Sequence, residues 1–566
     1  MWTKENCGKL SEEVRVWCEE NRIHPLVRPL FSKLGITTVE QVHKFLYSNL
    51  SDASSSTAFG EQIYKAVKRI NRAVNSGEHI VLFGDYDVDG TTGTALLMTV
   101  FEYFKKAKGF TVDYIVPDRF SEGYGLNDKS MLRLLQMNPN LVITIDCGIK
   151  SVSQIEKLKS MGIDVIVTDH HHPGDKLPEA AVAIVHPEVC NFPNKKLCGC
   201  GVAYQLARAI WQTKGLPVPE WVEYGLLDFV ALGTICDMMP LVGDNRIYVR
   251  EGLKILNTRQ RTAIAVMKNK LGWNKIDRGI IGFQIGPCIN ANGRLEKADT
   301  AVKFLLSRDV KECTRLVDII AERNQKRKEL QAHVVEKGLL QIPHQRYKNI
   351  IVIMGDDFHE GVVGIAASKF VNKYRKPTFI LHDGGAHVGG SARSLPGIDL
   401  YSSMKKFEHL LHTWGGHSAA AGLKLQKSDM DEFFRSVDED LDRYARDVWE
   451  AGFTYFGEIT EEGMLTEDFF RSLELFEPFG YGFPAPIWKM SGCIVDEKHL
   501  KKDAKVGKIE VSGNKYNFAM WENAEKSFWY QDQVYYGTWE RHPKYGPQFT
   551  AIDAEPPKRQ KICIHF

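Results

Sequence analysis

The sequence predicts an α/β protein of several domains, with a doubly wound parallel sheet as its main part. Three observations support this fold class. Short apolar runs alternate with helical segments from residue 79 onward, as buried parallel strands and their crossover helices do. The length of 566 residues exceeds what one hydrophobic core covers. From about residue 455 the pattern changes to short, aromatic strand-like runs, which favour a small β-barrel.

The composition excludes several classes of protein. Hydrophobic residues make up 43% of the chain and charged residues 25%, as in ordinary globular proteins. The net charge of +2 argues against a positively coated protein that wraps duplex DNA, but is compatible with a local basic groove. Because no apolar run reaches membrane-spanning length and the first residues lack signal-peptide features, we expect a cytoplasmic protein without membrane contact. The 11 scattered cysteines indicate reduced thiols.

Shifts in the sequence pattern divide the chain into five expected regions. Residues 1–78 read as a helical accessory region. Residues 79–298 carry the alternation of strands and helices, and residues 299–342 have the amphipathic spacing of a long connecting helix. Residues 343–450 return to β-rich runs with glycine-rich loops and predict a second α/β domain. Residues 451–566 are expected to form an OB-like β-barrel.

Acidic and histidine side chains follow four apolar runs that we interpret as strands. The runs are VLFG, LVITI, DVIVT and FVALGTIC. In a doubly wound sheet, ligands bind beyond the carboxyl ends of the strands. The side chains expected at this edge are Asp85, Asp87, Asp89, Asp146, Asp169, His170, His171 and Asp237.

This set of side chains favours a divalent metal site. Clustered carboxylates repel one another unless cations neutralise them. Carboxylate oxygens with one or two imidazoles suit Mn²⁺ or Mg²⁺ better than a thiolate zinc site does. Two such ions, roughly 3.5–4 Å apart, clamp the attacking and leaving oxygens of phosphoryl transfer. Each motif alone is more often a turn or a helix cap, and it is their joint occurrence that predicts the site.

The motifs resemble those of a known superfamily. GDYDVDG, ITIDCG, VTDHH and LGTICDMMPL are similar to the four motifs of the DHH phosphoesterases. VPDRFSEGYGLN, IGPCINANGRL, GGSARS, WGGHSAAAG and PFGYGFPAP narrow the resemblance to the RecJ family of bacterial single-strand-specific exonucleases. The resemblance covers residues 79 to about 486 and implies a DHH domain followed by a DHHA1 domain. His186 and Phe483 depart from the family pattern, in loops away from the expected ligands.

The resemblance also implies roles for the clustered residues. It implies two bound Mn²⁺ or Mg²⁺ ions, with the ligands Asp85, Asp87, Asp146, His170 and Asp237. His171 would face the scissile phosphate as an electrostatic helper or acid, and Asp169 would orient its neighbours. Two roles stay open for Asp89, which is either a third acidic ligand or a loop cap.

A second set of residues is expected to contact the substrate. Arg119, Arg294 and Arg393 are candidates because a guanidinium group matches a phosphate bidentately. The resemblance implies that Arg119, Ser391 and Arg393 hold the 5′ end of the strand. The full set of expected contacts is Arg119, Asn290, Arg294, Ser391, Arg393, Gly416 and His417.

The C-terminal aromatics allow two interpretations. OB-like folds stack bases on exposed aromatics, but a small barrel also needs aromatics for its core, and for each residue the core role is favoured. The residues concerned are Tyr516, Phe518, Trp521, Trp529, Tyr535, Tyr536 and Trp539. The tail PPKRQK is a weak candidate for a phosphate contact.

These observations lead to one expected function and two alternatives. We expect a monomeric, metal-dependent 5′→3′ exonuclease of single-stranded DNA that releases mononucleotides in DNA repair and recombination, with a helicase and a single-strand-binding protein as partners. One alternative is a DHH-family enzyme that cleaves oligoribonucleotides or cyclic dinucleotides. The added terminal regions favour a longer polymer. The other alternative is a catalytically inactive single-strand-binding scaffold, which the complete set of chelating residues disfavours.

Overall fold

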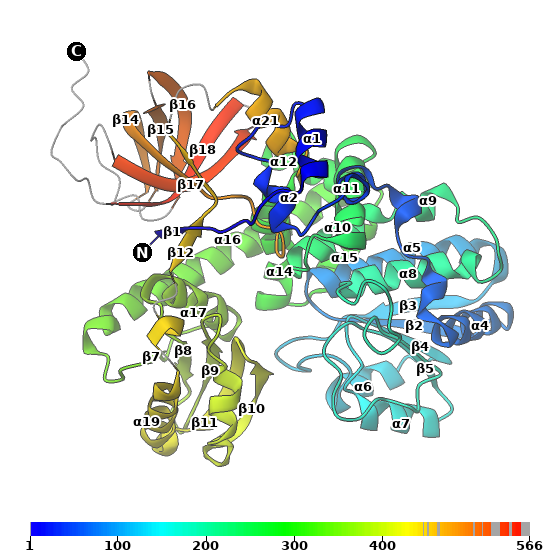
Figure 1. Cartoon of the computed structure of the whole chain (residues 1–566). Helices are drawn as coiled ribbons and strands as arrows, with labels where there is room; N and C mark the ends of the chain where they lie inside the picture. The colour runs from blue at the N-terminus through cyan, green and yellow to red at the C-terminus, as the bar shows by residue number, and fades with distance from the viewer. Residues whose placement is uncertain are drawn as a thin grey trace. The chain divides into compact units, whose positions relative to one another are not determined.

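The computed structural model describes residues 2–444, 446–449, 452–460, 465–501, 504–511, 513–521, 533–542 and 546–555. The chain forms two compact units (Figure 1). The first unit comprises Met1–Gly286, Ala301–Thr314 and Gly452–Phe566, and the second comprises Pro287–Thr300 and Arg315–Ala451. Within the described part of the chain, no helix is both long enough and apolar enough to cross a membrane.

The centre of the first unit is a parallel sheet with the strand order β3-β2-β4-β5-β6. All four strand pairings are parallel. The strands are β2 (His79–Gly84), β3 (Thr111–Ile115), β4 (Leu141–Ile145), β5 (Asp164–Thr168) and β6 (Ala183–Val185). The inner strand β4 is buried along its whole length, as expected for a strand covered on both faces.

Helices cover both faces of this sheet, which confirms the expected doubly wound arrangement. Side chains at alternate strand positions, such as Val81 and Phe83, share one buried cluster with Leu134, Ile155 and Leu158 of the covering helices. Figure 1 shows α6 and α7 on one side of the sheet and α5 and α8 on the other. These helices are α5 (Val88–Lys108), α6 (Asp128–Leu135), α7 (Val152–Ser160) and α8 (Gly199–Gln212).

The N-terminal helices share a hydrophobic core with the C-terminal barrel. Trp17 and Phe31 belong to the same buried cluster as Phe476, Trp488 and Trp539. The strand β1 (Trp2–Lys4) also pairs in parallel with β12 (Phe453–Tyr455). The N-terminal elements are α1 (Glu12–Glu20), α2 (Pro29–Lys33), α3 (Val39–Tyr47), η1 (Leu50–Asp52), η2 (Ser56–Phe59) and α4 (Glu61–Asn75).

The C-terminal part of the first unit is a closed barrel, as expected for an OB-like domain. The strands follow the order β14-β15-β16-β18-β17, and an additional pairing of β14 with β17 closes the ring. The strands are β13 (Gly457–Ile459), β14 (Trp488–Lys501), β15 (Ala504–Val511), β16 (Asn514–Met520), β17 (Gln533–His542) and β18 (Gly546–Ala554), and the helix α21 spans Glu467–Glu474.

The second unit contains a mixed sheet with the order β10-β11-β9-β8-β7. Only β7 and β8 pair in parallel, and α17 (Glu360–Tyr374) connects them. The strands are β7 (Ile351–Gly355), β8 (Thr378–Asp383), β9 (His387–Arg393), β10 (Leu411–His417) and β11 (Ala420–Gln426). The smaller elements of this region are η4 (Ile342–His344), α18 (Leu400–Lys405), η5 (Glu408–Leu410), η6 (Lys427–Asp429), α19 (Met430–Asp440), η7 (Leu441–Arg443) and α20 (Arg446–Trp449).

The remaining helices follow the parallel sheet in the sequence. They are α9 (Glu220–Glu223), α10 (Leu227–Cys236), α11 (Gly243–Thr258), α12 (Thr262–Leu271), α13 (Arg278–Ile280), the π-helical η3 (Ile281–Ile285), α14 (Gly286–Leu295), α15 (Asp299–Leu306) and α16 (Val310–Gln341). The stretch 299–342 thus holds a long helix preceded by a shorter one. The break occurs where Asp309 Oδ1 accepts the N–H of Glu312 at 2.7 Å, which caps the start of α16.

Candidate metal centre and phosphate-contact residues

Three strands of the parallel sheet each end in a candidate ligand. Asp85 follows β2, Asp146 follows β4, and His170 lies just beyond β5. The N–H of Asp85 donates to the carbonyl of Ile145 at 3.2 Å, so the strand pairing continues into the site. Asp146 has a φ of 62°, a left-handed conformation that is costly for a residue with a β-carbon. The surrounding structure therefore holds this carboxylate in a fixed direction.

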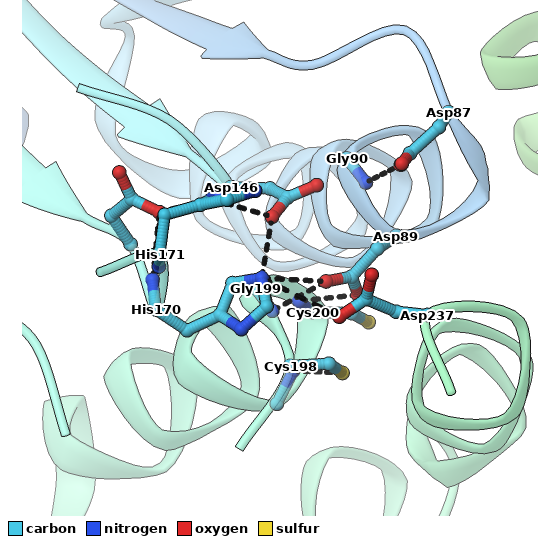
Figure 2. A network of polar contacts seen from close by, with 12 residues as sticks. Asp87, Asp89, Gly90, Asp146, His170, His171, Cys198, Gly199, Cys200 and Asp237 are labelled. Atoms are coloured by element: carbon cyan, nitrogen blue, oxygen red, sulfur yellow. Dashed lines mark hydrogen bonds and ion pairs between the residues drawn. The ribbon is translucent and has the colours of Figure 1, made fainter. Parts of the chain in front are cut away.

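Two helix ends complete the cluster. Asp87 is the N-cap of α5 and its Oδ1 accepts the N–H of Gly90 at 3.1 Å (Figure 2). Asp89 lies in the first turn of the same helix. Asp237 is the C-cap of α10, so the prediction that it follows a strand is wrong. The apolar run before it is a helix that is buried nearly all around, and such a run lacks the one-sided periodicity that separates a helix from a buried strand.

The imidazole of His170 lies at the centre of the acidic side chains. Its Nε2 is 3.0 Å from Asp146 Oδ1, 3.5 Å from Asp237 Oδ2 and 3.7 Å from Asp89 Oδ2 (Figure 2). Side chains from the ends of β4, β5 and α10 thus meet those of α5 within one small volume. The structure therefore brings together the residues that the sequence predicted as a metal-binding set.

The N-terminus of α8 packs directly against this cluster. The two carboxylate oxygens of Asp89 accept the N–H groups of Gly199 at 2.5 Å and Cys200 at 2.9 Å (Figure 2). A β-carbon on Gly199 would lie 2.5 Å from the β-carbon of Asp146, so the helix approaches this closely only because residue 199 is glycine. These contacts are those of a cap, here on another helix. Asp89 also belongs to a candidate ligand group with His170 and Asp237, so both roles stay open for it.

The cluster is electrostatically strained when its acids are ionised. Burial, and then the charge of Asp87, raises the pKa of Asp85 well above its usual value. Burial and the charge of Asp89 raise the pKa of Asp146 well above its usual value and that of Asp237 to about 9. The acids repel one another because they are buried and close, which a bound cation would relieve.

The two neighbouring histidines have opposite protonation tendencies. Burial, and then the charge of His171, lowers the pKa of His170 to about 3, which favours the neutral imidazole that binds metals. Burial acts to lower the pKa of His171, but its hydrogen bond with Asp169 and the charges of Asp169, Asp237 and Asp85 together raise it to about 9. That bond is 2.8 Å long, from His171 Nδ1 to Asp169 Oδ1.

Further contacts orient His171 in the site. The hydroxyl group of Tyr124 lies 3.3 Å from each ring nitrogen of His171 and donates to the carbonyl of Asp146 at 3.2 Å. Asp169 also accepts the N–H groups of His170 and Ile149, at 2.7 and 2.9 Å. Sequence reasoning missed Tyr124, although it belongs to the EGYG segment that follows Arg119.

Four buried polar atoms of the cluster have no hydrogen-bond partner. They are Asp85 Oδ1, Asp146 Oδ1, His170 Nε2 and Asp237 Oδ2. The 3.0 Å approach of His170 Nε2 to Asp146 Oδ1 does not have hydrogen-bond geometry. Buried polar atoms are rarely left without a partner, so these atoms fit a metal ion. Three overlapping groups have ligand atoms within 4.8 Å of one another: Asp85, Asp87 and Asp146; Asp89, His170 and Asp237; and Asp146, His170 and His171.

Arg119 also belongs to this site. Its guanidinium carbon lies 5.4 Å from the centre of the Tyr86 ring, and its charge lowers the pKa of Asp85, although burial outweighs that contribution. Tyr86 in turn meets Tyr124 edge to face, with ring centres 6.3 Å apart. The structure thus places one expected phosphate contact beside the metal cluster of the first unit.

The other expected contacts lie in the second unit. Ser391 and Arg393 are alternate residues of β9 and point to the same face of the sheet, where Arg393 donates to Ser391 Oγ at 2.8 Å. The strand pairing places Arg393 beside Ala420, which pairs with His417 of β10. Gly416 precedes His417 and has a φ of 151°, and a β-carbon there would lie 2.2 Å from the carbonyl oxygen of Ala420.

Asn290 and Arg294 both belong to α14 of the second unit. Arg294 Nη1 donates to the carbonyl of Gly361 at 3.3 Å, in the first turn of α17. A β-carbon on Gly364, one turn further along α17, would lie 2.7 Å from Arg393 Nη2 and 3.0 Å from Ser391 Oγ. The beginning of α17 thus contacts both arginines.

Most of the described barrel aromatics are core residues. Phe518, Tyr535, Tyr536 and Trp539 are buried, which matches the core interpretation. Trp521 is 54% exposed and is available for a contact. Trp529 and the tail at 556–561 lie outside the described residues.

Family models match three parts of the chain. The DHH family N-terminal domain matches residues 79–234, the DHHA1 domain matches residues 347–442, and the RecJ OB domain matches residues 458–536.

Curated relatives match most of the chain. The single-stranded-DNA-specific exonuclease RecJ of Escherichia coli is 30% identical over 511 residues, which cover 84% of this chain and 86% of that protein. The protein of the same name from Bacillus subtilis is 32% identical over 499 residues, which cover 86% of this chain and 61% of that protein. The chain therefore spans less than two thirds of the Bacillus relative.

Solved structures of similar proteins share the fold. The structure of RecJ in complex with Mn²⁺ from Thermus thermophilus has a TM-score of 0.80 and 26% identity, and the match covers 97% of this chain and 78% of that chain. A structure of exonuclease RecJ bound to manganese has a TM-score of 0.60 and 31% identity, and covers 69% of this chain and 97% of that chain. Manganese is the bound ion in both of these structures.

Proposed function

The chain belongs to the RecJ family of single-stranded-DNA-specific exonucleases, and on that basis we propose that it hydrolyses single-stranded DNA from the 5′ end with two divalent ions, Mn²⁺ or Mg²⁺. The products are mononucleotides. The observation that supports the chemistry most directly is the set of four buried ligand atoms without hydrogen-bond partners at one edge of the parallel sheet. The two manganese-bound structures of similar proteins support Mn²⁺ as one of these ions.

Five residues hold the metal ions in this proposal. They are Asp85, Asp87, Asp146, His170 and Asp237. When bound, the pair of cations stabilises the charge of the phosphoryl group and lowers the pKa of a water molecule that attacks it. Asp146 and His170 each belong to two of the three ligand groups, and the one acceptor nitrogen of His170 would serve a single ion. Asp89 binds the N–H groups of Gly199 and Cys200 and so holds the start of α8 against the cluster.

His171 acts on the phosphate itself in this mechanism. Its raised pKa keeps the imidazole protonated at neutral pH, because Asp169 accepts the proton-bearing Nδ1. The charged ring stabilises the phosphate as negative charge develops there and can give a proton to the leaving oxygen. Tyr124 and Asp169 fix the ring in one orientation, so little reorganisation is needed during the reaction.

The 5′ end is held by hydroxyl and guanidinium groups in this proposal. Arg119, Ser391 and Arg393 bind the terminal phosphate, and the other contacts, Asn290, Arg294, Gly416 and His417, bind phosphates or the adjoining sugar. A guanidinium group suits this role because it offers two parallel N–H donors to a phosphate. An enzyme that requires a terminal phosphate for binding is an exonuclease rather than an endonuclease.

The test is digestion of single strands labelled at the 5′ or the 3′ end, with Mn²⁺ or Mg²⁺, followed over time. We expect the 5′ label to be released at once as a mononucleotide, while the 3′-labelled strand shortens progressively. His170→Ala is the inactive control. Early release of the 3′ label would contradict the proposed direction, because degradation would then start at the 3′ end. Hydrolysis of dinucleotides alone would favour the oligonucleotide-degrading alternative, and strand binding without hydrolysis or metal uptake would favour the scaffold.

Several finer points stay predictions. We propose a role in DNA repair and recombination, a helicase and a single-strand-binding protein as partners, and a monomeric state. These rest on the resemblance of the chain to its family. Sedimentation of the purified chain tests the monomeric state. Sedimentation with a single-strand-binding protein tests that partner.

A further inference from the structure

Asn245 is a buried amide whose hydrogen bonds join two separate segments of the first unit. It lies in the first turn of α11, in the stretch VGDNR that follows the motif containing Asp237. Its Nδ2 donates to the carbonyl of Lys196 at 2.6 Å and to that of Pro240 at 3.1 Å. Its Oδ1 accepts a hydrogen bond from Asn194 Nδ2 at 3.0 Å. The residue is 1% exposed, so water does not compete for these bonds.

The first of the two segments is the turn that follows Asp237. Pro240 lies three residues after this proposed ligand. Between them, Met238 has a φ of 55°, and the N–H of Met239 donates to the carbonyl of Thr234 in the last turn of α10 at 3.0 Å. The turn is short and held at both points, so the position of the Pro240 carbonyl is coupled to that of Asp237.

The second segment leads into α8. Lys196 precedes Leu197, whose backbone forms a hydrogen bond with the imidazole of His170. Metal-binding histidines commonly use their second ring nitrogen in this way, which fixes the direction of the first. Two residues further along, the first residue of α8 donates its N–H to Asp89. The segment that Asn245 holds at Lys196 thus contacts two side chains of the metal cluster.

The helix that carries Asn245 is itself firmly anchored. The next residue, Arg246, is buried and donates at 2.9 to 3.0 Å to three successive backbone carbonyls, those of Phe476, Glu477 and Pro478. A β-carbon on Gly252 would lie 2.2 Å from the carbonyl oxygen of Leu227, so α11 also lies close against α10. Asn245 therefore bonds the two segments from a fixed position.

The two segments lead to one candidate ligand group. Asp237 and His170 both belong to the group that includes Asp89, and Asp237 Oδ2 lies 3.5 Å from His170 Nε2. Ionised acids in the cluster repel one another, which tends to move the segments that hold them apart. The hydrogen bonds of Asn245 oppose that movement, because the same amide group holds both segments.

We propose that Asn245 is a positioning residue of the metal centre, which holds Asp237 and His170 at the separation that a divalent cation requires. This inference rests on the proposed function. Asn245 is not a ligand, and it acts through the backbone of the segments that carry or contact the ligands. A site whose ligands are held in place before binding needs little reorganisation, so its affinity for the cation is higher.

The test is calorimetric titration of Mn²⁺ into the metal-free protein, with Asn245→Leu as the variant. Leucine has a branched side chain of similar size to asparagine, carries no charge and forms no hydrogen bonds. We expect the Kd for Mn²⁺ to rise about tenfold or more, as for other residues that orient metal ligands. With DNA present, the Mn²⁺ concentration that gives half-maximal activity should rise by the same factor, and excess Mn²⁺ should restore the rate.

Asn257→Leu is the matched control, because Asn257 lies on the same helix and makes the same kinds of bonds. Its Nδ2 donates to the carbonyls of Leu253 and Ile276 at 2.7 Å each, and its Oδ1 accepts the N–H of Ile276 at 2.9 Å. These partners lie in α11 and just before α13, which carry no proposed ligand. Both variants should lower the melting temperature in EDTA by similar amounts, but Asn257→Leu should bind Mn²⁺ like the unchanged protein.

Two results would overturn the proposal. One is an unchanged Kd for Mn²⁺ in Asn245→Leu. The other is an equal rise of Kd in Asn245→Leu and Asn257→Leu, because lost stability rather than positioning would then weaken binding. Should Asn245→Leu fail to fold, the partly exposed Asn194 offers a milder change. Asn194→Ala removes one hydrogen bond to Asn245 and should raise Kd about threefold, and an unchanged Kd would likewise reject the inference.

Metal binding without DNA separates this inference from the proposed function. If the unchanged protein and Asn245→Leu bind Mn²⁺ equally well, only the positioning role of Asn245 is rejected, whatever the nuclease activity. If the unchanged protein takes up no Mn²⁺, the proposed function is rejected and this inference with it.

Discussion

The metal cluster of the first unit and the Ser391–Arg393 pair of the second unit differ in how their charges are satisfied. In the metal cluster Asp85, Asp89 and Asp146 are buried and Asp87 and Asp237 are partly buried. Four polar atoms of this cluster have no hydrogen-bond partner. Arg393 instead donates to Ser391 Oγ and to the carbonyl of Ala392, both at 2.8 Å, and is only half-buried. The first cluster therefore needs a ligand for its own stability, while the second is compatible with the protein alone.

This difference predicts how each cluster responds to mutation. Removing an acid from the metal cluster removes a proposed metal ligand but also a repulsive charge, so activity and metal-free stability should change in opposite directions. Removing Arg393 should reduce substrate binding and leave stability almost unchanged. The contrast is between acids that repel one another and an arginine whose donors already have partners within the protein.

The largest effect is expected from His170→Ala and Asp146→Asn. Each should lower kcat by about a thousandfold or more, because each removes a proposed metal ligand at the centre of the candidate ligand groups. In EDTA, Asp146→Asn should not lower the melting temperature, because it removes one of the mutually repelling carboxylates. Steady-state kinetics with Mn²⁺ and thermal melting in EDTA measure the two quantities.

Asp113→Asn is the matched control for these variants, because Asp113 is an exposed acid on β3 of the same sheet. It should leave kcat unchanged. A large loss of melting temperature in EDTA with Asp146→Asn would contradict the contrast between the clusters, since the acid would then be a stabilising group without a metal.

The next largest effect is expected from Arg393→Ala on strands with a 5′ phosphate. We expect kcat/KM to fall about a hundredfold, and Arg393→Lys to restore little of it, because an ammonium group cannot make two parallel hydrogen bonds. Strands with a 5′ hydroxyl should be affected far less. Arg435→Ala, an exposed arginine on α19 of the same unit, is the control. Equal losses on both kinds of strand would contradict binding of the terminal phosphate.

Parts of the site that depend on local sequence could be predicted. Asp85, Asp146 and His170 follow short runs of apolar and β-branched residues, and the carboxyl ends of parallel strands meet at one edge whatever the rest of the fold is. The prediction that these side chains lie close together does not require the order of the strands in the sheet. The barrel was predicted for the same kind of reason, from short strand-like runs with turn signals.

The parts that depend on contacts distant in sequence could not be predicted from local pattern. The run before Asp237 is apolar on every side, so its helix resembled a buried strand. The carboxylate of Asp89 caps a helix that begins 110 residues later, which no spacing rule indicates. The core shared by Trp17 and Trp488 could not be predicted from local pattern either, because these residues are far apart in the sequence and meet only in the folded chain.

A smaller effect tests the repulsion within the metal cluster through pH. The raised pKa of Asp237, about 9, and of His171, about 9, both lie above the usual values for these groups. Between pH 7 and pH 9 the folded metal-free protein thus holds more protons than the unfolded chain, so its stability falls as pH rises. The slope is at most about 1.4 kcal/mol per pH unit for each group. Thermal melting in EDTA across this range measures it.

Bound Mn²⁺ should flatten this dependence, because it favours the ionised acids. The gain in melting temperature on adding Mn²⁺ should therefore increase from pH 7 to pH 9. Asp237→Asn serves as the control, since it removes one of the two titrating groups and should reduce the slope in EDTA. Metal-free stability that rises with pH in this range would contradict the repulsive character of the cluster.

The smallest effect is expected from Trp521→Ala in the barrel, a region that belongs to neither cluster. Trp521 is 54% exposed, whereas the neighbouring Phe518 is buried in the core of the barrel. If Trp521 stacks a base far from the cleaved end, its loss should raise KM about threefold for long strands and leave strands of about six nucleotides unaffected, because short strands lack that base. An equal change for both lengths would place Trp521 at the cleavage site, and no change for either would exclude Trp521 from strand binding. The ratio of the two KM values therefore indicates whether strand binding extends beyond the cleavage site.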